Sequence, residues 1–235
     1  ERSTRMLGAV KPPSGRMTVV FDPWVSAQFL GIVGGTLSGE AVQKGRSLFA
    51  DRLGEDVASS ILTLVDDPTD PAAYTATETD GEGLATRRNV LLADGRLERF
   101  VHNSETARRA GTTSTGSAVR GYSSTPGVGV RAVAVVPGVR SPTDLISGIR
   151  DGLLVQGVSG LHSGVNTVSG DFSTGAEGLW IRDGELAEPV REFTVASTIQ
   201  KMLTDVTAIG DDLQWLPMRA AGVTLVIGEL TVSGV

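Results

Sequence analysis

The chain has no cysteine among its 235 residues and only two histidines. It can therefore form no disulfide and can offer no thiolate to a metal ion. This composition suits a reducing compartment, and we expect a cytoplasmic location. Aromatic residues are also scarce, at 5%, whereas glycine is abundant, at 30 residues. Abundant glycine together with many valines and threonines favours strands and turns over long helices.

Long apolar segments and basic stripes are missing as well. No run of about 18 apolar residues occurs, so the sequence predicts no transmembrane helix, and no apolar signal-peptide core follows the N-terminal residues ERSTRM. The net charge is −6, with acidic and basic residues interspersed. Short basic pairs such as Arg87-Arg88 are typical of a solvated surface, whereas a nucleic-acid-binding domain carries a basic stripe. We expect no nucleic acid and no membrane among the partners.

Local patterns predict a series of short strands and short helices. The strands are expected at residues 17–21, 61–65, 130–136, 223–227 and 230–232. A capping residue followed by apolar positions at helical spacing predicts a helix. Helices are expected after Asp22-Pro23 as far as Gly34-Gly35, over 46–53, over 103–110, from Ser141 to near Gly152, and over 199–209. The polar stretches 69–86 and 112–129 are expected to form loops.

Two Asp-Gly pairs, Asp94-Gly95 and Asp183-Gly184, each separate two extended runs. This pattern predicts hairpins with type I′ turns, with strands at 89–93 and 96–102 in the first and at 179–182 and 185–190 in the second. Either an internal duplication or the general frequency of Asp-Gly turns explains their likeness. Hairpins mixed with isolated helices predict an α+β fold with a mostly antiparallel, curved or barrel-like β-sheet and several short helices. We expect residues 1–235 to form a single domain.

The stretch 157–190 combines glycines and small hydroxyl residues at unusual density. So many glycines indicate a close approach of backbone segments, or backbone angles that other residues avoid. The same stretch contains His162, one of the two histidines. A loop histidine in such surroundings either bonds to the local backbone or takes part in binding.

No catalytic constellation is evident in the sequence. Zinc hydrolysis needs several well-placed ligands, and the H-E-x-x-H helix pattern that supplies two of them is absent. His102 and His162 meet with a carboxylate only if the fold brings them together, and we interpret His102 as a residue at a strand end beside a helix cap. A Ser-His-Asp group of His162, Asp171 and a nearby serine needs a geometry that residue types alone do not supply. The sequence therefore predicts no catalytic residue and no metal ligand in this chain.

Three long stretches carry a family resemblance that covers most of the chain. They read GRSLFADRLGEDVAS followed by LTLVDDP, then TDGEGLATRRNVLLADGRLERFVHNSETARRAGTTSTGSA, then SGVNTVSGDFSTGAEGLWIRDGELAEPV with a helix leading into AIGDDL. In this order they resemble the C-terminal domain of the TldD/PmbA proteins, metalloprotease-like proteins once called modulators of DNA gyrase. Several long motifs in family order are more specific than any single short pattern.

The resemblance implies a division of labour between two subunits. TldD-like members carry a histidine-bearing zinc helix and a later cysteine ligand, and this chain has neither. The motif G-V-N-x-V-S-G-D-F is instead similar to that of the PmbA branch, also called TldE, which is taken to be the metal-free partner. We therefore expect a non-catalytic subunit without a cofactor of its own, paired as a heterodimer with a homologous TldD-like subunit that holds zinc and acts on peptides or unfolded proteins. By the same resemblance, an N-terminal domain normally precedes this one and is absent from this chain.

Glycine loops and strand edges suit main-chain pairing with a peptide, so we expect residues 157–172 to line a substrate cleft or the dimer seam. The residues expected to bind peptide or partner are His162, Ser163, Gly164, Asn166, Ser169, Gly170, Asp171 and Phe172. The alternative for this segment is a tight internal crossover whose glycines serve packing alone. Two other functions stay open: a stand-alone binding or scaffold protein of the same fold, and an autonomous hydrolase that uses His162.

Overall fold

The computed structural model describes residues 5–234. Within it the chain divides into two compact units. Unit 1 contains the chain up to Ser26, Pro137–Gln214 and the part from Gly222 onward, and unit 2 contains Ala27–Val136 and Trp215–Ala221. This division into compact units does not test whether residues 1–235 form a single domain, which stays a prediction.

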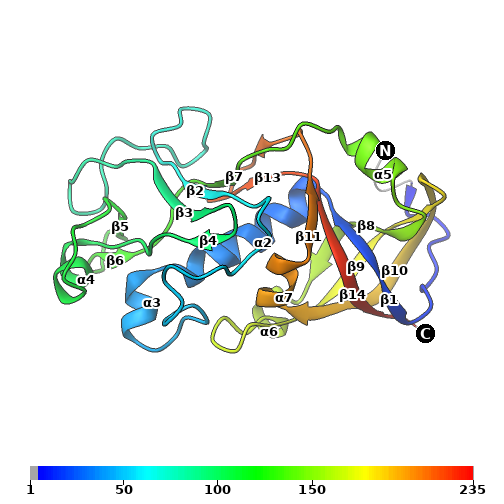
Figure 1. Cartoon of the computed structure of the whole chain (residues 1–235), viewed down its shortest axis with the longest axis horizontal. Helices are drawn as coiled ribbons and strands as arrows, with labels where there is room; N and C mark the ends of the chain where they lie inside the picture. Colours follow the sequence, from blue (N-terminus) through cyan, green and yellow to red (C-terminus); the bar gives the residue numbers. More distant parts are fainter. Residues whose placement is uncertain (1–4, 235) are drawn as a thin grey trace. The chain divides into compact units, whose positions relative to one another are not determined.

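Unit 1 is built on a closed barrel of five strands (Figure 1). The strands are β1 (Gly15–Phe21), β8 (Asp151–Ser159), β9 (Asp171–Arg182), β10 (Glu185–Thr198) and β14 (Leu225–Ser233). They pair in the order β1-β8-β9-β10-β14, and β14 pairs again with β1 to close the ring. β1 and β8 run parallel, and the other pairs of the ring are antiparallel. The prediction of an α+β fold with a mostly antiparallel, barrel-like sheet is therefore confirmed.

A short helix, α5 (Pro142–Ser147), covers one face of the barrel strands in unit 1. The helix begins as predicted at Ser141, whose hydroxyl accepts the N–H of Asp144 at 3.1 Å. Its apolar side chains join a buried cluster made of Val20, Leu145, Ile146, Leu154, Leu179, Ile181 and Val226. Because side chains alternate along a strand, the residues next to these in β1 and β8 point to the opposite face. These fully buried neighbours are Val19, Phe21, Leu153 and Val155.

The two Asp-Gly turns have the predicted geometry. The φ angle is 47° at Asp94 and 85° at Gly95, and it is 47° at Asp183 and 82° at Gly184. A positive φ at both central residues defines the type I′ turn, whose twist matches that of the flanking strands. In the second hairpin the strands are longer than predicted, because they extend through the whole of β9 and β10.

Unit 2 contains a four-stranded antiparallel sheet with the order β4-β3-β2-β7. The strands are β2 (Leu64–Asp66), β3 (Asn89–Ala93), β4 (Arg96–Leu97) and β7 (Val133–Val135). The strand expected over 96–102 ends early, because Val101 donates its N–H to Leu37 and accepts from Gly39 instead of continuing the hairpin. Other elements along this part of the chain are α2 (Pro23–Thr36), α3 (Gly39–Gln43), α4 (Ser104–Arg109), β5 (Ala118–Val119) and β6 (Gly127–Val128).

The helix expected over 199–209 is wrong in its second half. α7 (Ile199–Thr204) ends at Thr204, and the chain continues as strand β11 (Val206–Ile209). This strand pairs with β14, with Val206 opposite Ile227 and Ile209 opposite Leu225. Val206 and Ile209 are β-branched and buried in this pairing, so the sheet overrides the helical spacing of the apolar residues.

The helix expected over 46–53 is also wrong. The stretch forms successive turns, in which N–H groups bond three residues back, as from Arg52 to Phe49 at 3.0 Å. The Ser47 hydroxyl donates to the carbonyl of Thr36 at 2.6 Å and accepts the N–H of Phe49 at 3.1 Å. A serine that bonds nearby backbone in this way competes with helix formation. The helix lies earlier in the chain, at α3, where Ser38 is the cap.

The remaining boundaries differ from prediction by a few residues. α5 ends at Ser147, before Gly152, and the two strands expected over 223–232 are the single strand β14. The strands expected at 61–65 and 130–136 are the shorter β2 and β7. The other short elements are α6 (Leu161–Gly164), β12 (Gln214–Trp215) and β13 (Ala221–Gly222). No helix within residues 5–234 has both the length and the apolar character needed to cross a membrane.

Candidate functional site

The glycine-rich segment 157–172 connects β8 to β9 in unit 1. It contains the end of β8, the single-turn helix α6 and a loop that an isolated bridge between Val165 and Phe172 closes. Gly160 before the helix and Gly170 at the loop end have φ angles of 76° and 89°. These left-handed angles are the unusual backbone geometry that the glycine content predicts.

Most polar side chains of this loop bond within the loop itself. The Oδ1 atom of Asn166 accepts the N–H groups of Val168 at 2.9 Å and of Ser169 at 3.2 Å. The hydroxyl of Ser169 donates to Oδ2 of Asp171 at 2.6 Å. Asn166, Ser169 and Asp171 are therefore all engaged in hydrogen bonds that hold the loop.

Two of the loop glycines are required by close packing. A Cβ atom at Gly164 would overlap the carbonyl oxygen of Ser173 on β9, and one at Gly170 would overlap the side chain of Gln200 on α7. Gln200 donates its Nε2 hydrogen to the carbonyl of Ser169 at 3.1 Å. The loop is thus fastened to both β9 and α7, as the crossover interpretation of these glycines requires.

His162 and Ser163 lie on the exposed side of α6. The Ser163 hydroxyl donates to the carbonyl of Gly160 at 3.2 Å. Within residues 5–234, no hydrogen bond joins His162 to Asp171 or to a neighbouring serine, so the structure does not assemble the Ser-His-Asp group considered from the sequence. Of the eight predicted residues, Gly170 and Phe172 are buried, and the eight are distributed over α6, the loop and the start of β9.

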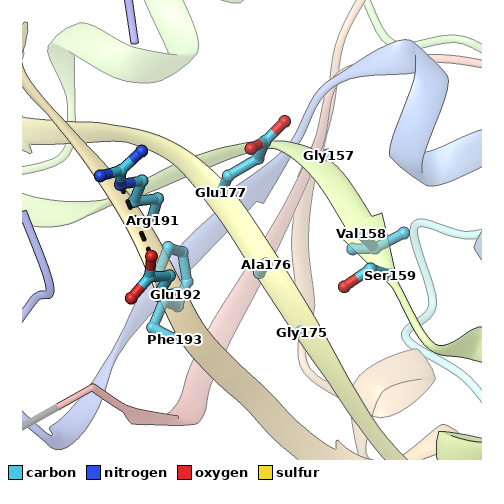
Figure 2. Close-up of a pocket in the computed structure, with 9 residues that line it drawn as sticks. All are labelled: Gly157, Val158, Ser159, Gly175, Ala176, Glu177, Arg191, Glu192 and Phe193. Atoms are coloured by element: carbon cyan, nitrogen blue, oxygen red, sulfur yellow. Dashed lines mark ion pairs between the residues drawn. The ribbon is translucent and has the colours of Figure 1, made fainter. Parts of the chain in front are cut away.

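A groove of about 350 Å³ lies over β8, β9 and β10 in unit 1 (Figure 2). The predicted segment enters this groove only at its beginning, through residues 157–159, and the eight predicted residues lie outside it. Sequence reasoning missed the opposite side of the groove, which Glu177 of β9 and Arg191 and Glu192 of β10 provide. These three residues lie just outside the strands predicted at 179–182 and 185–190, and the register that places them at the groove follows from the closed barrel.

Two β-bulges shape the groove. The pairing of β8 with β9 shifts between Val155 and Gly157, and the pairing of β10 with β9 shifts between Val190 and Phe193. In the second bulge Glu192 adopts a φ angle of 55°, which is rare for a residue with a side chain. Bulges of this kind bend a strand and redirect its side chains, and they are common beside functional sites.

The floor of the groove is backbone, because glycines stand where side chains would fill it. An added Cβ atom at Gly157 would lie 2.9 Å from Oε1 of Glu177, and one at Gly175 would lie 2.6 Å from Oγ of Ser159. Side chains at these two positions would thus crowd the polar groups that border the groove. The glycines leave the carboxylate and the hydroxyl accessible to a ligand.

The charges around the groove are unevenly paired. Glu192 has two cationic neighbours, with its carboxylate 3.8 Å from Nε of Arg191 and 3.8 Å from Nζ of Lys11. The side chain of Glu177 is exposed, and its carboxylate has no ion pair or hydrogen bond within the described residues 5–234. Figure 2 shows its carboxylate between Gly157 on β8 and the Arg191–Glu192 pair on β10. The groove therefore offers an unpaired negative charge to a cationic or hydrogen-bond-donating ligand.

The end of β8 also has a free edge. β1 pairs with β8 only as far as Phe21 opposite Val155, and the N–H of Asp22 then bonds to the Val155 carbonyl. Residues 157–159 continue to pair with β9 on their other side. Among the strands that the structure describes, none pairs with the outer edge of these residues. An edge of this kind can accept an extended peptide through main-chain hydrogen bonds.

The described residues do not fit a zinc site. Within residues 5–234, no three His, Asp or Glu side chains gather closely enough to hold a metal ion. His102 lies beside the Asn103 cap of α4, as expected, and is only 8% exposed. Its Nδ1 atom is 3.1 Å from Oγ1 of Thr106, and burial lowers the pKa of the imidazole. The described residues therefore provide no site at which a bound metal ion could take part in a reaction.

The proteins with similar sequences include several metalloproteases. The chain is 32% identical to a metalloprotease of Methanothermobacter thermautotrophicus over 216 residues. This alignment covers 91% of this chain and 47% of the relative. It is 27% identical to the metalloprotease PmbA of Escherichia coli O157:H7, over 99% of this chain and 48% of the relative. The chain therefore spans about half the length of these relatives.

Solved structures agree with the sequence relatives. A proposed modulator of a DNA gyrase from Thermotoga maritima superposes with a TM-score of 0.93 at 28% identity, over 98% of this chain and 53% of that one. TldE from Thermococcus kodakarensis superposes with a TM-score of 0.88 at 27% identity, over the same two shares. Residues 14–234 match the family described as the PmbA/TldA metallopeptidase C-terminal domain. The chain therefore belongs to the PmbA/TldD family of metallopeptidases, through the C-terminal domain of that family.

Proposed function

We propose that this chain acts as a non-catalytic subunit, or as the C-terminal domain of one, in a TldD/TldE-type metalloprotease for peptides or unfolded proteins. The observation that carries the proposal is that this chain belongs to a metallopeptidase family, yet its residues 5–234 do not form a zinc site. The chain has no cysteine and two histidines, and one of these, His102, is buried beside a helix cap. Zinc and the catalytic groups are then supplied by a homologous TldD-like subunit.

The groove and the free edge of β8 give this subunit a role in substrate binding. An extended peptide pairs its main chain with residues 157–159, and the carboxylate of Glu177 holds an ammonium or amide group of the peptide. In this proposal His162 and the loop up to Phe172 lie beyond the groove, further along the connection from β8 to β9. Their part in peptide or partner binding stays a prediction, as does the cytoplasmic location.

The test is reconstitution of the full chain with its homologous TldD-like subunit. We expect the pure chain to bind no zinc and to cleave no peptide, and the complex to contain zinc and to cleave. Glu177→Gln should raise the KM of the complex for a peptide substrate about tenfold with little change in kcat, because a binding contact is lost. Glu229→Gln is a matched control, because Glu229 lies on β14 and pairs with Arg16 at 3.4 Å.

Three results would change the conclusion. Zinc and peptidase activity in the pure chain would establish the autonomous hydrolase. A chain that purifies alone and leaves the activity of the TldD-like subunit unaltered would favour the stand-alone scaffold. A KM that Glu177→Gln leaves unchanged would remove the groove from the peptide path while leaving the subunit role intact.

A further inference from the structure

Unit 2 contains a cavity of about 460 Å³ that the proposed function does not use. Its walls come from α3, from the chain that follows β4 and from the chain that follows α4. Its large apolar lining residues are Val42, Leu53 and Phe100, and its polar ones include Gln43 and three threonines. Leu53 is 57% exposed, which is a large exposed fraction for an aliphatic side chain. A cavity of this size that offers both apolar surface and polar groups can hold a small ligand.

His102 is the polar residue that the fold fixes against this cavity. Its Nδ1 atom is 3.1 Å from Oγ1 of Thr106, and that oxygen also accepts the N–H of Asn103 at 3.2 Å. On the other side the ring lies against Gly39, where any Cβ atom would overlap it. The ring is therefore held in one orientation. Its second nitrogen, Nε2, has no hydrogen-bond partner within residues 5–234.

Arg99 supplies a positive charge at the same cavity. Its side chain is exposed, and no carboxylate of the described residues lies within ion-pair distance of it. Oε1 of the adjacent Glu98 is 3.7 Å from Nε of Arg96, so Glu98 forms its ion pair with Arg96 and not with Arg99. Among the residues lining the cavity, Glu98, Arg99 and His102 are the charged or titratable ones. The cavity thus combines an unpaired guanidinium, an available imidazole nitrogen and an apolar wall.

We propose that this cavity binds a carboxylate attached to a compact apolar group, the chemistry of an apolar amino acid at a peptide C-terminus or in free form. The carboxylate lies between the guanidinium of Arg99 and Nε2 of His102. The apolar group lies against Val42, Leu53 and Phe100. Charge-assisted hydrogen bonds fix the carboxylate, and burial of the apolar group supplies the rest of the affinity. The proposal rests on unit 2 alone and is independent of the protease role.

This site has a pH signature that a simple apolar pocket lacks. Burial lowers the pKa of His102, so the free protein holds the ring neutral at neutral pH. A carboxylate beside Nε2 favours the protonated ring and raises that pKa. Binding then takes up a proton, so the affinity increases as the pH falls toward the range in which His102 titrates.

The first experiment is an NMR titration of the full chain with N-acetyl-leucine. The His102 ring signal is distinguished from the other histidine with the His162→Gln variant. We expect the signal to shift on binding and the affinity to be about tenfold higher near pH 6 than near pH 8. N-acetyl-leucinamide, which lacks the carboxylate, should produce no shift.

Variants test the two polar contacts. Arg99→Gln removes an exposed charge without touching the core, and it should weaken binding about tenfold or more. Arg109→Gln is the matched control, because Arg109 forms an ion pair with Glu105 on α4 and does not line the cavity. His102→Gln should remove the pH dependence if the variant folds. Arg99→Gln alone decides the matter if it does not.

Two further probes identify the source of the ligand. Free leucine that binds more tightly than an N-acetylated tetrapeptide ending in leucine indicates an amino-acid site, and the reverse order indicates a peptide C-terminus. Equal binding of the acid and the amide would overturn the proposal. So would a His102 signal that no probe shifts, or an affinity that Arg99→Gln leaves unaltered.

Discussion

At the residue scale, the most exceptional side chain is Asp66 on β2, which is fully buried. Its Oδ1 atom accepts the N–H groups of Arg131 at 2.8 Å and Ala132 at 2.7 Å. Its Oδ2 atom is buried and has no hydrogen-bond partner among residues 5–234. The same holds for Oδ1 of Asn89, which stands opposite Asp66 in the β2–β3 pair. Burial raises the pKa of Asp66, although the two N–H groups act in the other direction.

Asp66→Asn should therefore stabilise the protein at neutral pH. A raised pKa means that the folded state keeps its proton when the unfolded state has lost it, so the free energy of unfolding falls as the pH rises above the ordinary aspartate value of 3.8. Asparagine keeps an acceptor for the two N–H groups and can donate to Asn89. Urea unfolding should give a gain near pH 7 that shrinks near pH 4. A less stable variant at both pH values would contradict this account.

Residue-scale prediction from sequence succeeded where the cause is local. The caps at Asp22, Asn103 and Ser141 are confirmed, because a capping side chain bonds to backbone within three residues. His102 lies beside its cap as interpreted. The burial of Asp66 and the position of Glu177 in the groove were not foreseen. Asp66 is bonded to residues 131–132, and Glu177 lies opposite Gly157 on another strand. The sequence next to Asp66 and Glu177 does not indicate which distant segments they will meet.

At the scale of single elements, α2 carries two adjacent glycines with opposite surroundings. A Cβ atom at Gly34 would lie 2.9 Å from methyl carbons of both Val130 and Val133, whereas one at Gly35 would have nothing within 4 Å. The first glycine is buried and permits close packing. The second is exposed, and there glycine only lowers the stability of the helix.

The matched pair Gly34→Ala and Gly35→Ala tests this difference. We expect Gly35→Ala to raise the free energy of unfolding by about 0.5–1 kcal/mol, because alanine loses less entropy in a helix. Gly34→Ala should lower it by about 1–3 kcal/mol, because the added methyl overpacks the contact with the two valines. Denaturant unfolding of both variants decides, and changes of the same sign would show that helix propensity alone governs both positions.

Elements were predictable to the extent that local chemistry selects them. The Asp-Gly turns at Asp94 and Asp183 appeared with the expected angles, because few other backbone conformations suit that pair. The helix predicted over 199–209 is only half correct, because the apolar spacing there suits a helix while Val206 and Ile209 pair with β14. Local pattern cannot distinguish these outcomes when the strand partner lies elsewhere in the chain.

At the scale of the whole molecule, the barrel-like character was predicted, but the strand order was not. β1 lies between β14 and β8, one from the end of the described chain and one from its middle. The groove depends on this order, since two bulges in neighbouring strand pairs must meet over β9. Composition and turn signals predict strands and hairpins, but they do not specify which strands become neighbours after a long connection.

Pairing on both sides should make β1 exchange its amide hydrogens more slowly than β11. Its amides lie between two hydrogen-bonded neighbours, and Val20 is fully buried. β11 pairs with β14 along one side only and has a bulge between Val206 and Ala208. Native-state hydrogen exchange should therefore protect the centre of β1 about a hundredfold or more over Thr207. Equal exchange in the two strands would mean that unit 1 opens as a whole before either strand frays.

The pairing of β1 with β14 has a consequence for the newborn chain. A ribosome that adds about 5–20 residues per second needs roughly 10–40 s to pass from β1 to β14. Throughout that interval Val19, Val20 and Phe21, which the finished barrel buries completely, lack their last neighbour. All of unit 2 is synthesised in the meantime. The barrel can thus close only after unit 2 has been synthesised, and until then its strand β1 is a segment that a nascent-chain chaperone would shield.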